Sequence, residues 1–267
     1  MSALAYTVSD SRTLLRRNLR RLRRYPSMTL MLVGMPIVFL LLFVYVFGGQ
    51  LSHGLSGALA GGHVGRSGYL NYVAPGILLM TIAATVQGTA IVVAMDMTGG
   101  IIDRFRTMAI ARAAVLTGHV LASLIQTLVS IAVVLGVAVA LGFRPTADPL
   151  HWLAAIGLIV LFGFALIWLA TALGLAARSV ETASNTPMFL TLLPFLGSGF
   201  VPTGTMPAGL RQFAAYQPFT PVTETLRGLL TGTHIGTHAI VAIAWSVGIA
   251  AASYLWATRL YTRRQPR

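Results

Sequence analysis

The sequence predicts an all-α integral membrane protein, a single membrane domain over residues 1–267 with about six transmembrane helices. An interfacial amphipathic helix is expected at the N-terminus, and re-entrant short helices before the last span. Hydrophobic residues make up 56% of the chain and charged residues only 9%, whereas about a quarter of a soluble domain is charged. The apolar residues are spread along the whole chain, and the arginines lie between the apolar runs. Such a chain cannot cover a water-facing surface.

The basic residues and the missing residue types exclude several functions. All nineteen basic residues are arginine, so no lysine is available for a Walker A phosphate loop or a Schiff base. The chain has no cysteine, which excludes disulfides, thiolate metal sites and cysteine nucleophiles. A net charge of +13 can indicate nucleic-acid binding. Here the arginines flank apolar runs, where they orient a chain in a bilayer, so no nucleic-acid partner is expected.

Residues 8–25 predict a helix that lies flat on the membrane surface. On a helical wheel the apolar residues share an arc of about 140°, and they are Val8, Leu14, Leu15, Leu19 and Leu22. The opposite side carries Arg12, Arg16, Arg17, Arg20, Arg21, Arg23 and Arg24. This separation is typical of an interfacial helix on anionic lipid. The alternative is an arginine cluster that sets topology without forming an ordered helix.

Six apolar segments are read as membrane spans, since at 1.5 Å per residue about twenty residues cross a hydrocarbon core of about 30 Å. They lie at about 28–48, 73–95, 119–141, 152–176, 186–201 and 239–258. The fifth is the weakest, because it contains Pro187 and Pro194. The segment 49–72 is rich in glycine and is expected to be a loop.

The distribution of arginine predicts the orientation. With the N-terminus in the cytoplasm, fifteen arginines lie on the cytoplasmic side and four on the other side. Positive residues are enriched on the cytoplasmic side of membrane proteins. We therefore expect a multi-pass protein of the plasma (inner) membrane with both termini in the cytoplasm.

The cytoplasmic loop 99–112 combines glycine, both signs of charge and an aromatic residue. Its distinctive residues are Gly99, Gly100, Asp103, Arg104, Phe105, Arg106, Thr107 and Arg112. Glycines allow the backbone to turn sharply out of the second span. Aromatic and arginine residues are frequent anchors of interfaces, so this loop could dock in a groove of a cytosolic partner. The alternative is an ordinary inside loop.

Prolines interrupt the apolar region before the last span, and this outer region, 202–238, is where re-entrant helices are expected. The prolines are Pro194, Pro202, Pro207, Pro218 and Pro221. Non-helical backbone at membrane depth must be buried in protein or line a water-filled cavity. Thr220 and Pro221 predict a helix start, and Glu224 and Arg227, three residues apart, predict an ion pair. The alternative is a loop on the outer surface.

Polar residues within the second and third spans define a candidate cargo path. They are Thr81, Thr85, Gln87, Gln126 and Thr127. Such groups also serve as hydrogen-bond partners between helices, and the sequence does not separate the two interpretations.

The residues give little support to two other functions, an intramembrane enzyme and an ion-coupled secondary transporter. An intramembrane enzyme needs paired ionisable groups. His234 and His238 could share a helix face, but neither a carboxylate nor a third histidine accompanies them, so no metal site is expected. Gly197-Ser198-Gly199 is interpreted as a close helix contact. An ion-coupled secondary transporter usually needs a buried acid, and Asp96 is interpreted as a topological charge at the inner end of a span.

Two of these regions carry a resemblance to a known family. The loop reads Gly99-Gly100-Ile101-Ile102-Asp103-Arg104-Phe105-Arg106-Thr107-Met108 and continues to Arg112 and Val115-Leu116. The second region is spaced by Ser179-Val180-Glu181, Leu193-Pro194, Ser198, Phe200-Val201-Pro202, Met206-Pro207, Leu210, Pro218, Thr220-Pro221, Glu224 and Arg227. Both are similar to motifs of the ABC-2 type permeases, and more narrowly of the daunorubicin-resistance permease group. Gln217, in place of asparagine, and the glycines at 197 and 199 depart from that pattern.

The resemblance implies an ATP-driven exporter permease. Two permeases, identical or related, would pair with two separately encoded cytosolic ATPases, which bind ATP and magnesium, while this chain itself binds no cofactor and catalyses no reaction. The N-terminal helix and the loop 99–112 would contact those ATPases. The cargo would be a hydrophobic drug, an antibiotic or a lipid-like molecule. The alternative function is an ion-coupled secondary transporter.

Overall fold

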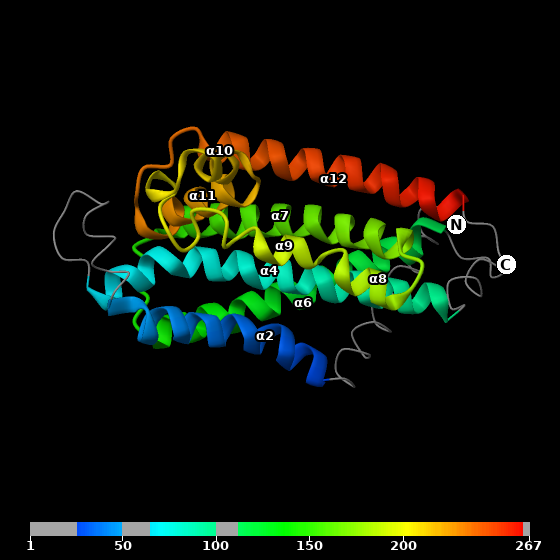
Figure 1. Ribbon diagram of the computed structural model, residues 1–267, viewed down its shortest axis with the longest axis horizontal. Coiled ribbons are helices and arrows are strands. Elements are labelled where there is room, and N and C mark those ends of the chain that lie inside the picture. Colours follow the sequence, from blue (N-terminus) through cyan, green and yellow to red (C-terminus); the bar gives the residue numbers. More distant parts are fainter. Residues whose placement is uncertain (1–25, 50–64, 100–111, 264–267) are drawn as a thin grey trace.

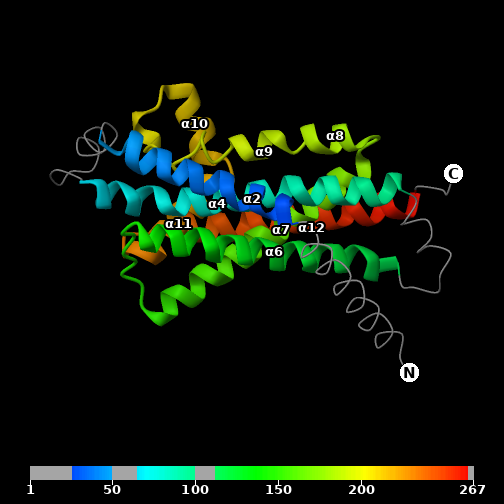
Figure 2. The ribbon, with the colours of Figure 1, turned by 90° about the horizontal axis from the view of Figure 1, so that it is seen from below.

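The computed structural model describes residues 26–49, 65–99 and 112–263, and within these ranges every regular element is a helix. Figures 1 and 2 show an elongated bundle in which α4, α7 and α12 run in one direction and α2 and α6 in the other. The elements are α2 (Pro26–Leu41), η1 (Leu42–Val46), α4 (Arg66–Thr98), α6 (Arg112–Ala140), α7 (Pro149–Ala176), α8 (Val180–Asn185), α9 (Met188–Leu192), η2 (Thr203–Thr205), α10 (Ala208–Tyr216), α11 (Phe219–Thr231) and α12 (His238–Arg263).

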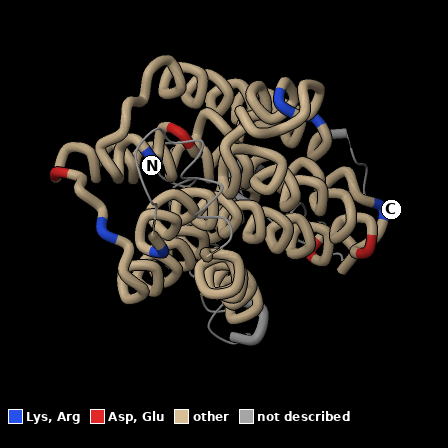
Figure 3. The backbone as a smooth tube through the Cα atoms, turned by 60° about the vertical axis from the view of Figure 1, so that its left-hand side comes forward, with Lys and Arg blue, Asp and Glu red and all other residues tan. Residues whose placement is uncertain are grey.

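Four of these helices are long and apolar enough to cross a membrane: α4, α6, α7 and α12. They coincide with the second, third, fourth and last predicted spans and confirm an all-helical membrane protein. The apolar segment Leu30–Val46 is shorter and corresponds to the first predicted span. Figure 3 shows that charged residues are few along the described backbone. Long helices with so few charges are suited to a bilayer.

The first span is not a uniform α-helix. α2 contains Pro36 and passes at Leu42 into the π-helical turn η1. At the same end of the bundle, Arg66 places its guanidinium 3.8 Å from the ring centroid of Tyr45 and donates from Nε to the Val44 carbonyl at 3.4 Å. This contact joins η1 to the first residue of α4. Proline and a π-turn are both known causes of helix irregularity.

Helix α4 begins at Arg66, seven residues before the predicted start of the second span at 73. The prediction of a loop through residue 72 was therefore wrong for its last residues. The physical reason is burial, because Tyr69, Leu70 and Tyr72 pack inside the bundle. Helical structure in that first turn satisfies their backbone groups where water is excluded. α4 packs against α2, α6, α7, α8 and α11, and is the central helix of the described fold.

The fifth predicted span, 186–201, is not a continuous helix. Two short helices, α8 and α9, are separated at Pro187, and turns follow from Leu193 to Phe200. Pro187 and Pro194 account for the breaks, because each lacks an N–H group and its ring clashes with the preceding helical turn. The Ser179 hydroxyl caps α8 by accepting a hydrogen bond from the Thr182 N–H at 3.2 Å.

The outer region 202–238 contains η2 and two short helices, α10 and α11, beside the start of α12 (Figure 1). α10 is largely exposed, whereas α11 is buried along nearly its whole length. The predicted start of α11 was wrong, because Pro218 precedes its first residue and Thr220 and Pro221 lie inside the first turn. α11 ends at Gly232, whose φ of 73° is in the left-handed region that glycine adopts readily.

The turn between α6 and α7 is fastened to α4 and α11. The Arg144 N–H donates to Asn71 Oδ1 at 3.2 Å, and the Thr146 N–H donates to the Leu230 carbonyl at 2.9 Å. Asp148 caps α7, accepting from the His151 N–H at 2.8 Å. This hydrogen bond to its charged form lowers the pKa of the exposed Asp148 carboxyl.

Helix α12 packs along α7 through small residues. Its buried positions include Ala242, Ser246, Ser253 and Ala257. Small side chains let two membrane helices approach closely. The opposite side of α12 exposes large apolar residues such as Ile240, Val247 and Leu255, as expected for a surface facing lipid or another apolar partner.

Candidate functional site

The turns between α9 and η2 pack closely on α4 and α11, and they lie at the centre of the candidate functional site. A Cβ atom built on Gly76 of α4 would lie 2.5 Å from the Gly199 carbonyl oxygen. One built on Gly197 would lie 2.3 Å from Gln217 Nε2. Real Cβ atoms do not approach other atoms so closely; at Gly76 the obstructing atoms are backbone, so that position requires glycine, whereas at Gly197 they are the side chains of Gln217 and Thr220, which would have to shift. The interpretation of Gly197-Ser198-Gly199 as a close helix contact is confirmed.

Arg227 of α11 joins three segments at the end of the bundle where α4 begins. Its Nε and Nη2 each donate to the Tyr72 carbonyl of α4 at 3.2 Å, and Nη2 also donates to the Ser198 carbonyl at 2.7 Å. Its Nη1 lies 2.7 Å from Glu224 Oε1, the ion pair that the three-residue spacing predicted. The arginine is only 7% exposed. Burial strengthens hydrogen bonds to a charged donor and makes their loss costly.

Tyr72 completes this cluster from α4. Its ring centroid lies 3.8 Å below the Arg227 guanidinium carbon, a cation–π contact, and its hydroxyl donates to the Ser198 carbonyl at 3.0 Å. We define the outer arginine cluster, named for the side of the membrane that the arginine distribution predicts for it, as Tyr72, Ser198, Gln217, Glu224 and Arg227. The Arg227 guanidinium thus connects its own helix, α11, to two other segments, which are α4 and the turn that follows α9.

Gln217 connects α11 to the end of α9. Its Nε2 donates to the Leu193 carbonyl at 3.0 Å and approaches Thr220 Oγ1 at 3.4 Å, and Thr220 Oγ1 accepts from the Ser198 N–H at 3.3 Å. Within the described residues, the buried atoms Ser198 Oγ and Gln217 Oε1 have no hydrogen-bond partner. Leaving a buried polar atom unpaired is costly, so these two atoms are the least stable part of the network.

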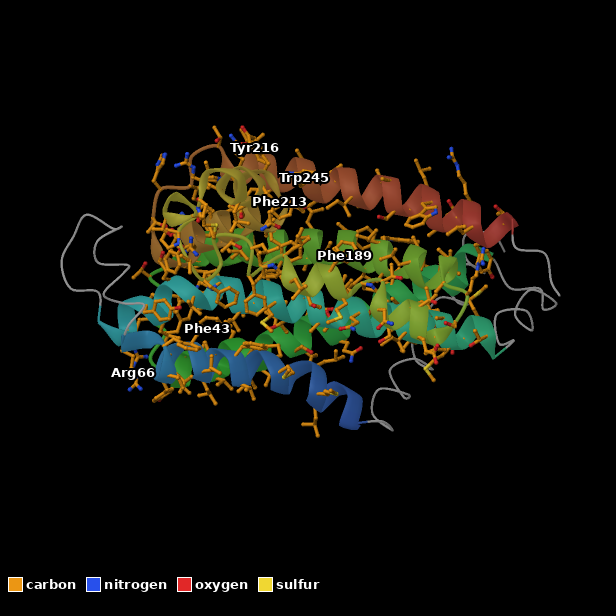
Figure 4. All side chains as sticks on the ribbon, in the orientation of Figure 1. Phe43, Arg66, Phe189, Phe213, Tyr216 and Trp245 are labelled. Atoms are coloured by element: carbon orange, nitrogen blue, oxygen red, sulfur yellow. The ribbon has the colours of Figure 1, made fainter. Side chains whose placement is uncertain are left out.

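Aromatic rings fix the same turn against the first span. The Phe200 ring stacks on Phe43 with centroids 4.5 Å apart and on Phe195 at 4.7 Å, and Phe195 also meets Phe39 at 5.4 Å edge-on. Figure 4 shows Phe43 and Arg66 at the end of the bundle where α2 and α4 approach each other. The turn therefore contacts α2 through rings and α4 through backbone and Arg227.

The prolines predicted for this site do not form one cluster. Pro194 is buried beside Gly199, and Pro221 is buried in the first turn of α11. Pro202, Pro207 and Pro218 precede η2, α10 and α11, where they end the preceding segments. They shape the chain around the outer arginine cluster.

The five residues of the candidate cargo path are placed in different surroundings. Thr85 and Thr127 are buried and joined across α4 and α6, with their hydroxyl oxygens 2.9 Å apart. Thr81 is buried and bonds to its own helix. Gln87 donates to the Ser184 carbonyl of α8 at 3.0 Å, and Gln126 is half-buried on α6. A cargo path through them stays a prediction.

Replacing Thr127 by valine is expected to lower the free energy of unfolding modestly. The substitution keeps the shape and removes the only hydroxyl that the structure shows bonded to Thr85 Oγ1. Hydrogen bonds between membrane helices contribute about 0.6 kcal/mol on average and up to about 1.7 kcal/mol. A double-mutant cycle of Thr85→Val and Thr127→Val in unfolding experiments measures the coupling, and additive effects would contradict a direct bond.

A second polar pair joins α4 and α6, near the last residue of α4 and the first turns of α6. Asp96 is 1% exposed and His119 is 5% exposed, and His119 Nε2 lies 3.3 Å from Asp96 Oδ2. Asp96 lies two residues before the end of α4, where the sequence placed it, but its interpretation as a purely topological charge needs correction, because the side chain is buried in the bundle. The apolar periodicity of the second span could not show this, since Asp96 follows the last strongly apolar run.

Most of the residues predicted to contact ATPases lie outside the described residues. These are the arginines of the interfacial helix 8–25 and the loop residues Gly100, Asp103, Arg104, Phe105, Arg106 and Thr107. Gly99 follows the last residue of α4, and Arg112 begins α6. The described part of the chain also holds no group of three or more histidine, aspartate or glutamate residues that could bind a metal.

Comparison with known proteins identifies the family of this chain. The family model of the ABC-2 type transporter matches residues 10–231. The chain is 28% identical over 263 residues to the daunorubicin resistance ABC transporter permease protein DrrB1 of Streptomyces coeruleorubidus, covering 98% of this chain and 89% of that protein.

A second similarity is to the probable doxorubicin resistance ABC transporter permease protein DrrC of two strains of Mycobacterium tuberculosis. There the identity is 27% over 175 residues, covering 64% of this chain and 63% of the relative. The family model spans most of the chain, including both regions that carried the resemblance. The chain therefore belongs to the ABC-2 type transporter family and is a membrane-spanning permease, a component in which ATP hydrolysis does not itself occur.

Proposed function

We propose that this chain is the permease of an ATP-driven exporter that moves a hydrophobic drug, antibiotic or lipid-like cargo across the plasma membrane. The observation that carries the proposal is the family match over residues 10–231, supported by a relative that covers 98% of the chain and is named for daunorubicin resistance. Two cytosolic ATPases would bind ATP and magnesium. Two permeases would form the translocation unit, with six crossings each and both termini in the cytoplasm.

The central position of α4 suggests how work done at the cytoplasmic face would reach the outer face. α4 runs from the outer arginine cluster at Tyr72 to Asp96, two residues before its end at Thr98. The coupling loop 99–112 continues directly from it. A displacement of this loop by the ATPases would move α4, and Arg227 would transmit that movement to α11 and the turn after α9. A rigid helix with defined contacts at both ends can carry such a movement.

Purification of the chain from its native membranes in mild detergent, followed by mass spectrometry, tests the proposal. A stoichiometric partner containing Gly-x-x-x-x-Gly-Lys-Ser/Thr, together with ATP hydrolysis by the complex, is the expected result. A chain that purifies without any nucleotide-binding partner, even after crosslinking, would refute it.

Substitutions in the coupling loop make the proposal residue-specific. Asp103→Ala and Arg104→Ala are expected to leave expression and membrane insertion unchanged and to abolish most transport, because both residues would anchor the ATPase interface. Arg144→Ala, in the outer turn, is the matched control. Normal transport by both loop variants would show that the coupling loop is assigned wrongly.

Ion-coupled transport remains a second candidate because of one observation, the burial of Asp96 beside His119. Ionisable residues inside a membrane protein mark ion or proton pathways by default. The two candidates differ in energy source. In inverted vesicles, uptake that stops on ATP depletion and survives a protonophore supports the exporter, and the opposite pattern supports ion coupling.

A further inference from the structure

The buried pair of Asp96 and His119 joins α4 and α6 at the base of the segment that connects them. Asp96 lies two residues before α4 ends at Thr98, and His119 lies seven residues after α6 begins at Arg112. Both side chains are almost fully buried. The helices on either side of the coupling loop are thereby fixed to each other where the loop leaves them.

The surroundings make this pair unusual. Among the described residues, the neighbouring side chains of α4, α6 and α7 form an apolar cluster that includes Val93, Leu116, Val120, Trp168 and Leu175. A carboxylate is costly to bury in such surroundings and is retained where a partner and a function require it. An apolar contact between the same helices would hold them together without this cost, so packing alone does not explain the choice of aspartate and histidine.

The same two helices are joined a second time at Thr85 and Thr127. Thr85 lies eleven residues before Asp96, about 16 Å along the helix. Two polar contacts at different heights prevent α4 and α6 from rotating or sliding against each other more effectively than one.

We propose that Asp96 and His119 form a clamp that makes α4 and α6 respond together when the coupling loop is displaced. Both are positioning residues, which act through the helices rather than on cargo or nucleotide. The inference rests on the proposed function, because it assumes that ATPases push on the loop 99–112. Without the clamp, movement of the loop would spread the inner ends of the two helices and be lost before it reached the outer arginine cluster.

The clamp itself is tested by a distance measurement that needs no transport. The chain contains no cysteine, so Met95→Cys and Leu121→Cys, both at exposed positions near the pair, accept spin labels selectively. In the permease–ATPase complex, double electron–electron resonance is expected to give one narrow distribution of the distance between the two labels, with and without ATP. Adding His119→Leu is expected to broaden it, and His119→Gln, which keeps a donor near the Nε2 position, is expected to restore a narrow distribution.

The coupling role is tested with daunorubicin as the transported probe in proteoliposomes. His119→Leu is expected to lower daunorubicin moved per ATP hydrolysed by about tenfold, whereas His119→Gln stays close to the original chain. A Gly136→Ala variant is the matched control in α6, because a Cβ at that position meets no atom within 4 Å and both polar contacts between the helices stay intact. An unchanged distance distribution in His119→Leu, or an unchanged ratio of transport to hydrolysis, would overturn the inference.

The exporter assignment and the clamp fail in different ways. If the unsubstituted complex neither hydrolyses ATP nor moves the probe, the proposed function and the coupling role fail together, and the distance measurement still decides whether the pair holds the helices. If the unsubstituted complex transports and His119→Leu does so with the same yield per ATP, the exporter stands and only the clamp is wrong.

Discussion

Replacing Arg227 by leucine is expected to lower the free energy of unfolding by about 3–5 kcal/mol, the usual cost of removing one partner of a buried ion pair. The substitution leaves the Tyr72 and Ser198 carbonyls without their arginine donor and Glu224 without its counter-charge. Unfolding of the purified permease in detergent, followed by circular dichroism during denaturant titration, measures the loss. A protein as stable as the original would show that the guanidinium does not hold the outer end together.

Two matched variants separate geometry from charge at the same position. Arg227→Lys keeps the positive charge, but one ammonium cannot reproduce the planar set of donors that reaches Tyr72, Ser198 and Glu224 together. It is expected to recover only part of the stability. Glu224→Gln removes the charge of a partly exposed partner and is expected to cost much less. If Arg227→Lys were fully stable, charge alone would explain the cluster.

The sequence predicted the long spans well because their signal is local. Apolar runs of twenty or more residues identified α4, α6, α7 and α12, and the errors at their ends came from residues whose burial depends on neighbours. The start of α4 is the clearest case, since Tyr69 and Tyr72 look like loop residues until the bundle buries them. The fifth span failed for the opposite reason. Its composition is apolar, but Pro187 and Pro194 break the helix locally.

The candidate site was predictable only where it is local in sequence. The pair of Glu224 and Arg227 follows from a three-residue spacing. The other acceptors of Arg227 are backbone carbonyls 155 and 29 residues away, at Tyr72 and Ser198. Every residue has a carbonyl group, so no side-chain pattern identifies the two that bind. A buried arginine in an apolar region is the available signal, and it indicates a partner without naming it.

Replacing Gly76 by alanine is expected to separate α4 from the turn after α9 and to destabilise the permease by about 1–3 kcal/mol or more. The added Cβ would lie 2.5 Å from the Gly199 carbonyl oxygen and 2.8 Å from the Gly199 Cα and carbonyl carbon. All three are backbone atoms, so no flexible side chain can move aside. Because Gly199 is next to Ser198, the displacement would also lengthen the Arg227 and Tyr72 hydrogen bonds to that carbonyl.

Gly136→Ala in α6 is the matched control, because a Cβ at that position meets no atom within 4 Å. Its stability is expected to stay within about 1 kcal/mol of the original, in the stabilising direction, since alanine favours helix more than glycine does. Unfolding of both variants under one set of detergent conditions compares them directly. Equal losses at Gly76 and Gly136 would mean that the bundle responds to any added methyl group. A loss at Gly76 alone would show that the close contact between α4 and this turn stabilises the permease, and would make Gly76→Ala the variant of choice for asking whether transport depends on that contact.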